Sequence, residues 1–479
     1  MKHSATSSIA IICVFFWMGA IQSLAQENDY KGFQAGSATS VITPPIGTSI
    51  NGNLQDGTVK NVHDETMARA IVLDDGEAKL AFVVSDLCAV YRETVDKAKE
   101  RAREFTGIPT ENMMMSATHT HSAGTACAVF QSEPDPAYLD FLSVRIADAL
   151  IRAHENRVPA RIGWGFGHEP NQVHNRRWKL KPGKTATNPL GGTDVVRTNP
   201  GVGNPDILEP AGPIDPEVAV ISIVALSGAP IGILANYSLH YVGGVNSGDI
   251  SADYYGIFNQ RMAQLLNAEN QKTPFVSIMS NGTSGDINNI DFTGKTSAAK
   301  GRYVQMNYVA DVLATETYKV VQNIEYQDDV KLSAAQQEIS VGVRLPDESD
   351  LKRAREILAA TEGSELKTMQ DFYARETVLM EDYPSEVEMI LQAFRIGELA
   401  IAAIPCEVFV DIGLDLKENS AIRPMFTVSL ANGYFGYLPT PQHHAWGGYE
   451  TWRARSSFLE VNASVKISET VFGLLESLK

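Results

Sequence analysis

Residues 113–122 read MMMSATHTHS, an apolar run that ends in small and hydroxylated residues carrying two histidines one residue apart. The run Met113–Ser116 predicts a buried strand that delivers the histidine pair at its end. Helices are predicted on both sides of this strand. Residues 94–105 carry alternating charges on their outer face, and residues 138–154 have apolar residues at helical spacing.

Two further apolar runs, Ala68–Val72 and Leu80–Val84, predict strands. The turn Asp74-Asp75-Gly76 between them predicts a hairpin. The order strand, helix, strand, helix is typical of an α/β unit. We therefore expect a large mixed α/β domain.

The second half of the chain continues this alternation. Val218–Leu226 and Ile231–Ser238 predict a hairpin that ends at His240. The other expected elements are helices over 254–266 and 302–323, a buried strand within the intervening PFVSIMSNGTSGD, a charged helical stretch over 347–380, and two short strands over 389–405 that lead into Cys406-Glu407.

Residues 180–213 interrupt the pattern, because they are rich in Pro, Gly, Asn and Thr and have no apolar period. A loop this long in a compact domain is usually functional or disordered. We interpret it as a lid or a wall of a substrate site, with a mobile linker as the alternative.

The first 25 residues have the pattern of an export signal. Lys2 supplies a positive charge, Ile9–Ile21 an apolar core, and Ser23-Leu24-Ala25 a cleavage site before Gln26. The core is shorter than the roughly 20 apolar residues that a permanent membrane helix needs. We expect residues 1–25 to be a cleaved signal peptide, residues 26–479 to form one domain, and the mature protein to be periplasmic or secreted. An uncleaved anchor is the alternative.

Composition narrows the classes of partner and of metal site. The formal charge is −17 and no basic run is present, so an extended nucleic-acid surface is not expected. A lipid-like substrate held by apolar surface, with peripheral membrane contact, stays compatible with this charge. After the signal, Cys88, Cys127 and Cys406 remain, an odd number without CxxC spacing. We expect buried free thiols rather than a disulfide scaffold or a cysteine-rich zinc site.

Four candidate sites share one placement, in which an apolar strand stops and a polar cluster follows at once. They are His119/His121, Tyr237–His240, Asn281–Asn289 and Glu407. In open α/β sheets, ligands bind in the crevice beyond the strand ends. The shared placement therefore predicts one site.

A zinc site is one interpretation of this placement. On an extended segment residues i and i+2 point to the same side, so His119 and His121 face one cavity. A catalytic zinc needs about three protein ligands, and His240 and Glu407 are the natural additions. Hydrogen-bonded loop histidines are the alternative. His443-His444 is interpreted as a surface pair.

The stretch SATHTHS resembles the ATHTHS motif of the neutral, non-lysosomal ceramidase family, zinc amidohydrolases that cleave the N-acyl bond of ceramide. The resemblance spans roughly residues 35 to 455, with the motifs in the family's order. The further motifs are GSATSVITPPIG, HDETMARAIVL with Arg69, VVSDL with Asp86, NQVHNRRW with Asn175-Arg176, IDPEVAVISIV, NYSLHYV with His240, ISADYYG with Asp253, AIPCEVF with Glu407, and YFGYLPTPQHHAWGGYE with Tyr437 and Tyr449.

The resemblance implies zinc ligands and catalytic groups. The implied ligands are His119, His240, Glu407 and Tyr437. It also implies that Arg176 and Tyr449 orient the substrate or stabilise the oxyanion, and that His121 is the acid/base. Zinc lowers the pKa of bound water to about 7 and polarises a carbonyl, as amide hydrolysis requires. From the residues alone, Tyr434, Tyr437 and Tyr449 would be ordinary half-buried aromatics.

Two departures from the family pattern affect mechanism and domain content. The family's serine stands in a Gly-Asp/Asn-x-Ser-Pro-Asn turn, where this chain has Asn288 after Gly285-Asp286-Ile287; Ser284 lies before that turn. We expect Asn288 to position the substrate or the oxyanion, while zinc-activated water attacks. We also expect no C-terminal immunoglobulin-like domain after the catalytic segment.

The sequence thus predicts an exported zinc hydrolase that cleaves an N-acyl amide such as ceramide. The alternatives are a hydrolase of the same scaffold acting on another amide, an ester or a glycan-derived substrate, and a binding protein that has lost catalysis. The lining of the pocket distinguishes the substrates. A long apolar groove would favour ceramide, and a short polar cup a small hydrophilic substrate.

Overall fold

The computed structural model describes residue 1 and residues 32–296, 299–361 and 366–479. Apart from Met1, the predicted signal peptide lies outside the described residues. Within the described residues, no helix combines the length and the apolar character needed to cross a bilayer.

An eight-stranded sheet forms the centre of the fold. Its strands, in spatial order, are β18 (Val276–Asn281), β16 (Pro230–Tyr237), β15 (Glu217–Ala225), β8 (Val158–His168), β1 (Gln34–Val41), β5 (Met67–Asp74), β6 (Lys79–Ser85) and β7 (Met113–Ala117). Only the pairs β16–β18 and β6–β7 are parallel; the other neighbours are antiparallel. The two predicted hairpins, β5–β6 and β15–β16, are confirmed.

A second, four-stranded sheet packs on one face of the first. Its strands are β20 (Leu332–Gly342), β21 (Glu386–Ile396), β22 (Leu399–Ala403) and β24 (Met425–Val428). Side chains of both sheets form one buried cluster, in which the ring centroids of Phe82 and Phe394 lie 5.3 Å apart. The core of the molecule therefore lies between two sheets.

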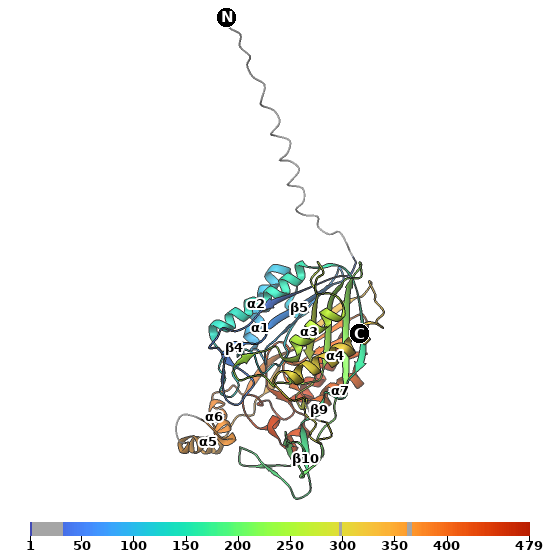
Figure 1. The fold of residues 1–479 in the computed structure, drawn as a ribbon. Coiled ribbons are helices and arrows are strands. Elements are labelled where there is room, and N and C mark those ends of the chain that lie inside the picture. The colour runs from blue at the N-terminus through green and yellow to red at the C-terminus, as the bar shows by residue number, and fades with distance from the viewer. Residues whose placement is uncertain (2–31, 297–298, 362–365) are drawn as a thin grey trace.

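Helices cover the outer faces of both sheets (Figure 1). The eight-stranded sheet carries α1 (Arg92–Thr106) and α2 (Pro136–Glu155) on one half, and α3 (Asp253–Leu265) and α4 (Val304–Val321) on the other. The four-stranded sheet packs against α9 (Ala463–Ser477). The mixed α/β fold predicted from the sequence is confirmed as a four-layer arrangement of helices, sheet, sheet and helix. The described residues contain no separate immunoglobulin-like domain.

One segment after β24 connects the two edges of the large sheet. The amide of Ser429 donates to the carbonyl of Asn281 in β18 (3.0 Å), and the amide of Asn432 donates to that of Met115 in β7 (2.7 Å). These two strands are the opposite edges of the sheet. Because one short segment bonds both edges, the loops after β7 and β16 meet at one place.

The shorter elements lie around the meeting point of the loops after β7 and β16 and along the surface. They are β2 (Ser49–Ile50), β3 (Gly57–Thr58), β4 (Asn61–Val62), β9 (His174–Asn175), β10 (Arg177–Leu180), β11 (Ala186–Thr187), β12 (Thr193–Asp194), β13 (Val196–Thr198), β14 (Ile207–Pro210), β17 (Asp249–Ile250), β19 (Ile287–Asn288), β23 (Glu407–Val408), β25 (Tyr437–Leu438), α5 (Glu348–Ala360), α6 (Met369–Leu379), α7 (Val410–Asn419) and α8 (Pro441–Trp446). Figure 1 shows β10, α5 and α6 at the same end of the molecule.

Two regions differ from the sequence prediction. The segment 180–213, expected to be a loop, contains parts of a three-stranded sheet, β13-β10-β14, and the hairpin β11–β12. Strand β8, in the middle of the large sheet, had no predicted counterpart. Its glycines replace the usual branched residues because α4 packs closely there; a Cβ on Gly165 would lie 2.8 Å from Val320.

Candidate active site

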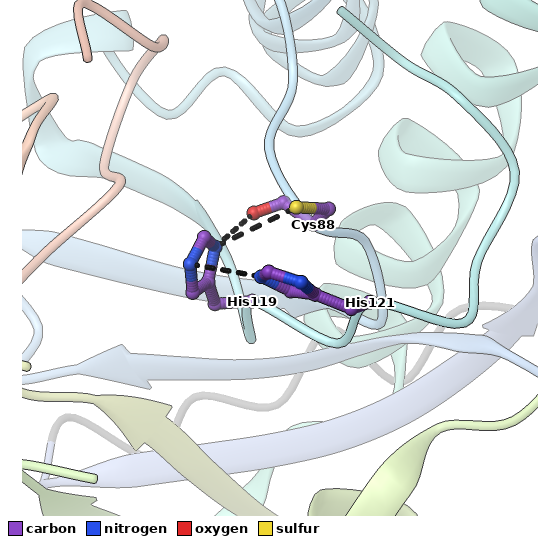
Figure 2. A group of neighbouring side chains, drawn as sticks. All are labelled: Cys88, His119 and His121. Carbon is purple, nitrogen blue, oxygen red and sulfur yellow. Dashed lines mark hydrogen bonds between the residues drawn. The ribbon is translucent and has the colours of Figure 1, made fainter. Parts of the chain in front are cut away.

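His119 lies two residues beyond β7 in a left-handed backbone conformation, with φ of 77°. Its side chain is buried, and its Nδ1 donates to the carbonyl oxygen of Cys88 at 2.7 Å (Figure 2). A carbonyl only accepts, so this bond places the ring proton on Nδ1. The lone pair of Nε2 then points into the site, as in histidines that bind a metal.

His240 repeats this arrangement from the loop after β16. Its Nδ1 donates to the carbonyl oxygen of Ser284 at 3.0 Å. The Nε2 atoms of His119 and His240 lie only 2.9 Å apart. Burial, followed by the neighbouring charges of His119 and Arg176, lowers the pKa of His240 well below its ordinary value. The Nδ1 bonds of both rings thus leave their two Nε2 atoms facing each other.

Glu407 completes the cluster. Its Oε2 lies 3.2 Å from Nε2 of His119 and 3.9 Å from Nε2 of His240, and this buried oxygen has no hydrogen-bond partner among the described residues. Its other oxygen accepts from the Tyr434 hydroxyl at 2.8 Å. Two imidazole nitrogens and a free carboxylate oxygen fit the donor set of a divalent metal such as zinc. We call His119, His240 and Glu407 the metal cluster.

The backbone around Glu407 explains its position. β23 pairs in parallel with β25, with Glu407 opposite Tyr437. On the other side, the amide of Gly285 donates to the carbonyl of Val408 at 2.8 Å. A Cβ on Gly285 would lie 2.5 Å from the Glu407 carbonyl oxygen, so this close approach requires glycine.

Arg176 connects the metal cluster to a second layer of buried groups. Its Nη2 donates to the Tyr437 hydroxyl (3.0 Å) and to the Gly285 carbonyl (2.8 Å), and its Nη1 lies 3.4 Å from Nε2 of His240. Its Nε donates to Glu450 at 2.8 Å. Burial alone would lower the pKa of Arg176, but the oxygens of Tyr437 and Glu450 outweigh it and raise that pKa.

Glu450 is a fully buried carboxylate that two arginines share. Besides Arg176, it accepts from Arg177 at 2.6 Å and from the hydroxyl of Thr198 at 2.7 Å. Burial would raise the pKa of Glu450, yet Arg177 and Arg176 lower it below its usual range. The carboxylate is therefore charged and holds Arg176 in place.

A cavity of about 750 Å³ opens above the metal cluster. Five of the predicted site residues line it: His121, Arg176, His240, Tyr437 and Tyr449. Residues 185–187 and 196–199 form one side, which we call the wall. The predicted role of the 180–213 segment as a substrate wall agrees with this placement.

The histidine and tyrosines of the lining differ in their contacts. Nε2 of His121 lies 3.3 Å from Nε2 of His119, and the His121 ring stacks on Tyr241 with centroids 3.6 Å apart. Burial lowers the pKa of His121 well below its ordinary value. The rings of Tyr437 and Tyr449 lie 5.8 Å apart, and burial raises the pKa of both phenols, so both keep their protons at neutral pH.

Asn288 is not among the residues that line the cavity. Its amide donates to the side-chain oxygen of Asn199, a wall residue, at 2.8 Å. Ser284 lies closer to the metal cluster, but its hydroxyl donates to Asn281 at 2.9 Å. The structure thus places Asn288 one contact away from the cavity, further than the sequence prediction placed it.

One sequence prediction about histidines is wrong. His443 is buried rather than exposed, and its Nε2 lies 2.8 Å from Asp411. It belongs to a second group with Asp286, whose carboxylate accepts from the amide of Val410 and the side chain of Asn175. The aromatic rings of Phe409 and Trp446 enclose His443, which explains why a histidine next to a turn is buried there. The three cysteines are buried free thiols, as predicted.

Sequence reasoning missed Glu450, Tyr241 and the contact of Tyr434 with Glu407. Tyr241 follows His240 directly, and Glu450 follows Tyr449, so adjacency to a predicted site residue was the available signal. The sequence around Glu450 contains no pattern that distinguishes a buried carboxylate from an exposed one.

Comparisons of the sequence and of the fold with known proteins relate the chain to neutral ceramidase. No family model matches the chain. The neutral ceramidase of Pseudomonas aeruginosa is 23% identical over 522 residues, which cover 94% of this chain and 72% of that protein. The crystal structure of that enzyme superposes with a TM-score of 0.71 at 18% identity, over 94% of this chain and 75% of that one.

A structure of a ceramidase complexed with C2 gives a TM-score of 0.70 at 17% identity, over 94% of this chain and 75% of that one. The chain therefore has the neutral ceramidase fold. The resemblance predicted from the motifs is confirmed along nearly its whole length.

Proposed function

We propose that this protein is a zinc-dependent amidohydrolase that cleaves an N-acyl amide, with a ceramide-like lipid as the first candidate substrate. One observation carries the proposal. In the metal cluster, two histidine nitrogens face each other at 2.9 Å and the nearby Glu407 oxygen has no partner among the described residues. A divalent cation would relieve both features. The similarity to neutral ceramidase, a protein named for ceramide cleavage, supports the substrate class.

His119, His240 and Glu407 would hold the metal, with the Tyr437 hydroxyl as the fourth candidate. When bound, zinc would supply a Lewis acid that polarises a carbonyl and lowers the pKa of water to about 7. The Nδ1 bonds of the two histidines to main-chain carbonyls fix the ring orientation that such binding requires.

The other cavity residues have separate roles in this proposal. Arg176 and Tyr449 would donate hydrogen bonds to the carbonyl oxygen of the amide as it gains negative charge. Tyr449 suits this role because its raised pKa keeps the phenol protonated. His121, with Nε2 facing the metal cluster, would move the proton between water and the leaving amine.

A hydrolase of the same chemistry acting on a more polar amide is the second candidate. The wall favours it, because four of the residues that line the cavity there are polar: Thr185, Thr187, Arg197 and Asn199. A ceramide has two long alkyl chains, and burying them against this side would leave polar groups without partners.

The test combines metal analysis with hydrolysis assays. The expected result is about one zinc per chain, release of fatty acid from a short-chain ceramide or a simpler N-acyl amide, and loss of both properties in His119→Ala, His240→Ala and Glu407→Ala. Full zinc content in all three variants would refute the site assignment. A zinc-loaded protein that hydrolyses no amide would refute the reaction.

We also propose that the chain is exported and that its mature form begins near Gln26. Residues 1–25 carry the charged, apolar and small-residue parts of a signal peptide. N-terminal sequencing of the natively exported protein tests this, and a retained Met1 would refute it.

A further inference from the structure

We infer that the cavity selects amide substrates that carry a negative charge, and that Arg197 is the residue that binds this charge. The inference rests on the proposed hydrolase function and names the class of substrate for the same site. It is carried by the charges of the cavity lining, by the free guanidinium of Arg197 and by the rigid attachment of β13.

The lining is cationic although the chain is acidic. Among the residues the structure describes, Arg176 and Arg197 are the charged residues of the lining, and no Asp or Glu lines the cavity. The chain as a whole has a formal charge of −17. A concave surface lined by one sign of charge concentrates ligands of the opposite sign. In a protein of net negative charge, this lining is a local exception that attracts anions.

Arg197 differs from Arg176 in having nothing to neutralise it. Arg176 is buried and bound to Glu450, Gly285 and Tyr437. The side chain of Arg197 is exposed, and no hydrogen bond or ion pair to it exists among the described residues. Its guanidinium is therefore available for a carboxylate or a similar anion, which it can bind through two parallel hydrogen bonds.

The buried charges behind the wall balance one another, so the uncompensated positive charge of the cavity is that of Arg197. Arg176 and Arg177 share the single carboxylate of Glu450. This buried group of three therefore carries one net positive charge, because both guanidiniums stay protonated. Asp194 also lies behind the wall, where its carboxylate accepts from Trp452, Asn188 and the amide of Gly448, and its negative charge offsets that positive charge.

The backbone holds Arg197 in a fixed place relative to the reacting centre. β13 pairs with β10, with Arg197 opposite Trp178. The neighbour Val196 is fully buried, and the neighbour Thr198 donates to Glu450, which in turn holds Arg176. The backbone of Arg197 is thus attached to the same rigid group that positions Arg176, which fixes the point from which its side chain extends.

Matched substrates test the inference. The first pair is N-octanoylglycine and N-octanoylethanolamine, which differ by a carboxylate on the amine half. The second pair is glutaryl anilide and pentanoyl anilide, which differ by a carboxylate on the acyl half. With zinc-loaded protein, kcat/KM is expected to favour the charged member of at least one pair by about 10-fold or more.

Arg197→Gln should remove that preference. We expect a loss of about 10- to 100-fold in kcat/KM on the charged substrate, mostly through KM, with little change on its neutral partner. Arg423→Gln is the matched control, because Arg423 is also exposed and unpaired within the described residues but does not line the cavity. It removes the same charge and should leave both rates unchanged.

A binding measurement separates this inference from the proposed reaction. Octanohydroxamate and suberic acid monohydroxamate have equal chain length and differ by a terminal carboxylate. Calorimetry on zinc-loaded protein should show tighter binding of the carboxylate ligand in the wild type and equal binding in Arg197→Gln. If no amide is hydrolysed but this difference appears, the reaction is wrong and the anion site stands. A preference for neutral substrates and ligands, or equal losses on both in Arg197→Gln, would overturn the inference.

Discussion

The metal cluster and the wall of the cavity are built in opposite ways. His119, His240 and Glu407 are buried; the two histidines are fixed by hydrogen bonds to main-chain carbonyls, and Glu407 by one from the half-buried Tyr434. The wall residues Thr185 and Arg197 are exposed and have no side-chain partners among the described residues. The cluster is thus preorganised for one kind of chemistry, whereas the wall is free to interact with a substrate. We therefore expect the reaction and the substrate specificity to depend on separate layers of the site.

Removing a ligand of the metal cluster should have the largest effect. His119→Ala deletes a nitrogen that faces both His240 and Glu407. We expect loss of the metal and a fall in kcat on the order of 10³-fold or more, because Lewis-acid stabilisation contributes several kcal/mol. Metal content and kcat measured together check this. His168→Ala, an exposed histidine outside the cavity, should be unchanged. Normal metal content in His119→Ala would show that the cluster is not the metal site.

Substitution of Glu450, which lies behind the metal cluster, should lower both the stability of the protein and its catalytic rate. Glu450→Gln leaves two buried guanidiniums without their shared carboxylate. Breaking such a buried pair costs about 3–5 kcal/mol. Denaturant unfolding should show this loss, and kcat should fall because Arg176 is no longer held. Lys479→Gln, at the exposed C-terminus, serves as the control.

The effect of Glu450→Gln on the free energy of unfolding should depend on pH. The two arginines lower the pKa of Glu450 in the folded protein below its ordinary value of 4.5. A lowered carboxyl pKa stabilises the fold above that value, and the stabilisation is lost as pH falls through the folded pKa. The difference in unfolding free energy between wild type and Glu450→Gln should therefore be constant above pH 4.5 and shrink below it. A difference that grows on acidification would contradict the charged state of Glu450.

Changes confined to the exposed part of the wall should affect substrate choice and leave the fold intact. Thr185→Val and Thr187→Val replace exposed hydroxyls that line the cavity. We expect the ratio of kcat/KM for apolar over charged amides to rise a few-fold, with stability within about 0.5 kcal/mol of wild type. Paired kinetics and thermal melts check both. Deleting residues 183–205 is a different experiment, because it removes Thr198 from Glu450 and Asp194 from Trp452 and should unfold the site.

The metal cluster could be predicted from sequence and the layers around it could not, for a physical reason. His119, His240 and Glu407 each follow an apolar strand, so the strand pattern and the side-chain chemistry indicated the same place. Arg197 and Glu450 have no local pattern of that kind. Glu450 is identified by its contact with Arg176, far along the chain, and Arg197 only by its position in the cavity lining.

In the fold, too, elements with a local sequence pattern could be predicted, whereas features that depend on tertiary packing could not. The strands and helices with clear apolar periodicity were predicted close to their observed bounds, including β5, β6, β15 and β16. Strand β8 was missed because close packing against α4 demands glycine where a strand pattern would have branched residues. The joining of β7 and β18 by the segment after β24 depends on main-chain bonds, which no residue type encodes.

Asn288 provides the smallest expected effect and the sharpest test of where the cavity ends. It donates to Asn199 in the wall and does not line the cavity. A direct oxyanion donor is worth roughly 10²-fold or more in rate, so a residue one contact behind the wall should cost less than about 10-fold. We expect Asn288→Ala to keep measurable kcat/KM and to lose little more in the double variant with Asn199→Ala, because the two share one contact. An Asn288→Ala variant as inactive as His119→Ala, or an acyl-enzyme trapped on Ser284, would mean that these residues take part in the reaction directly.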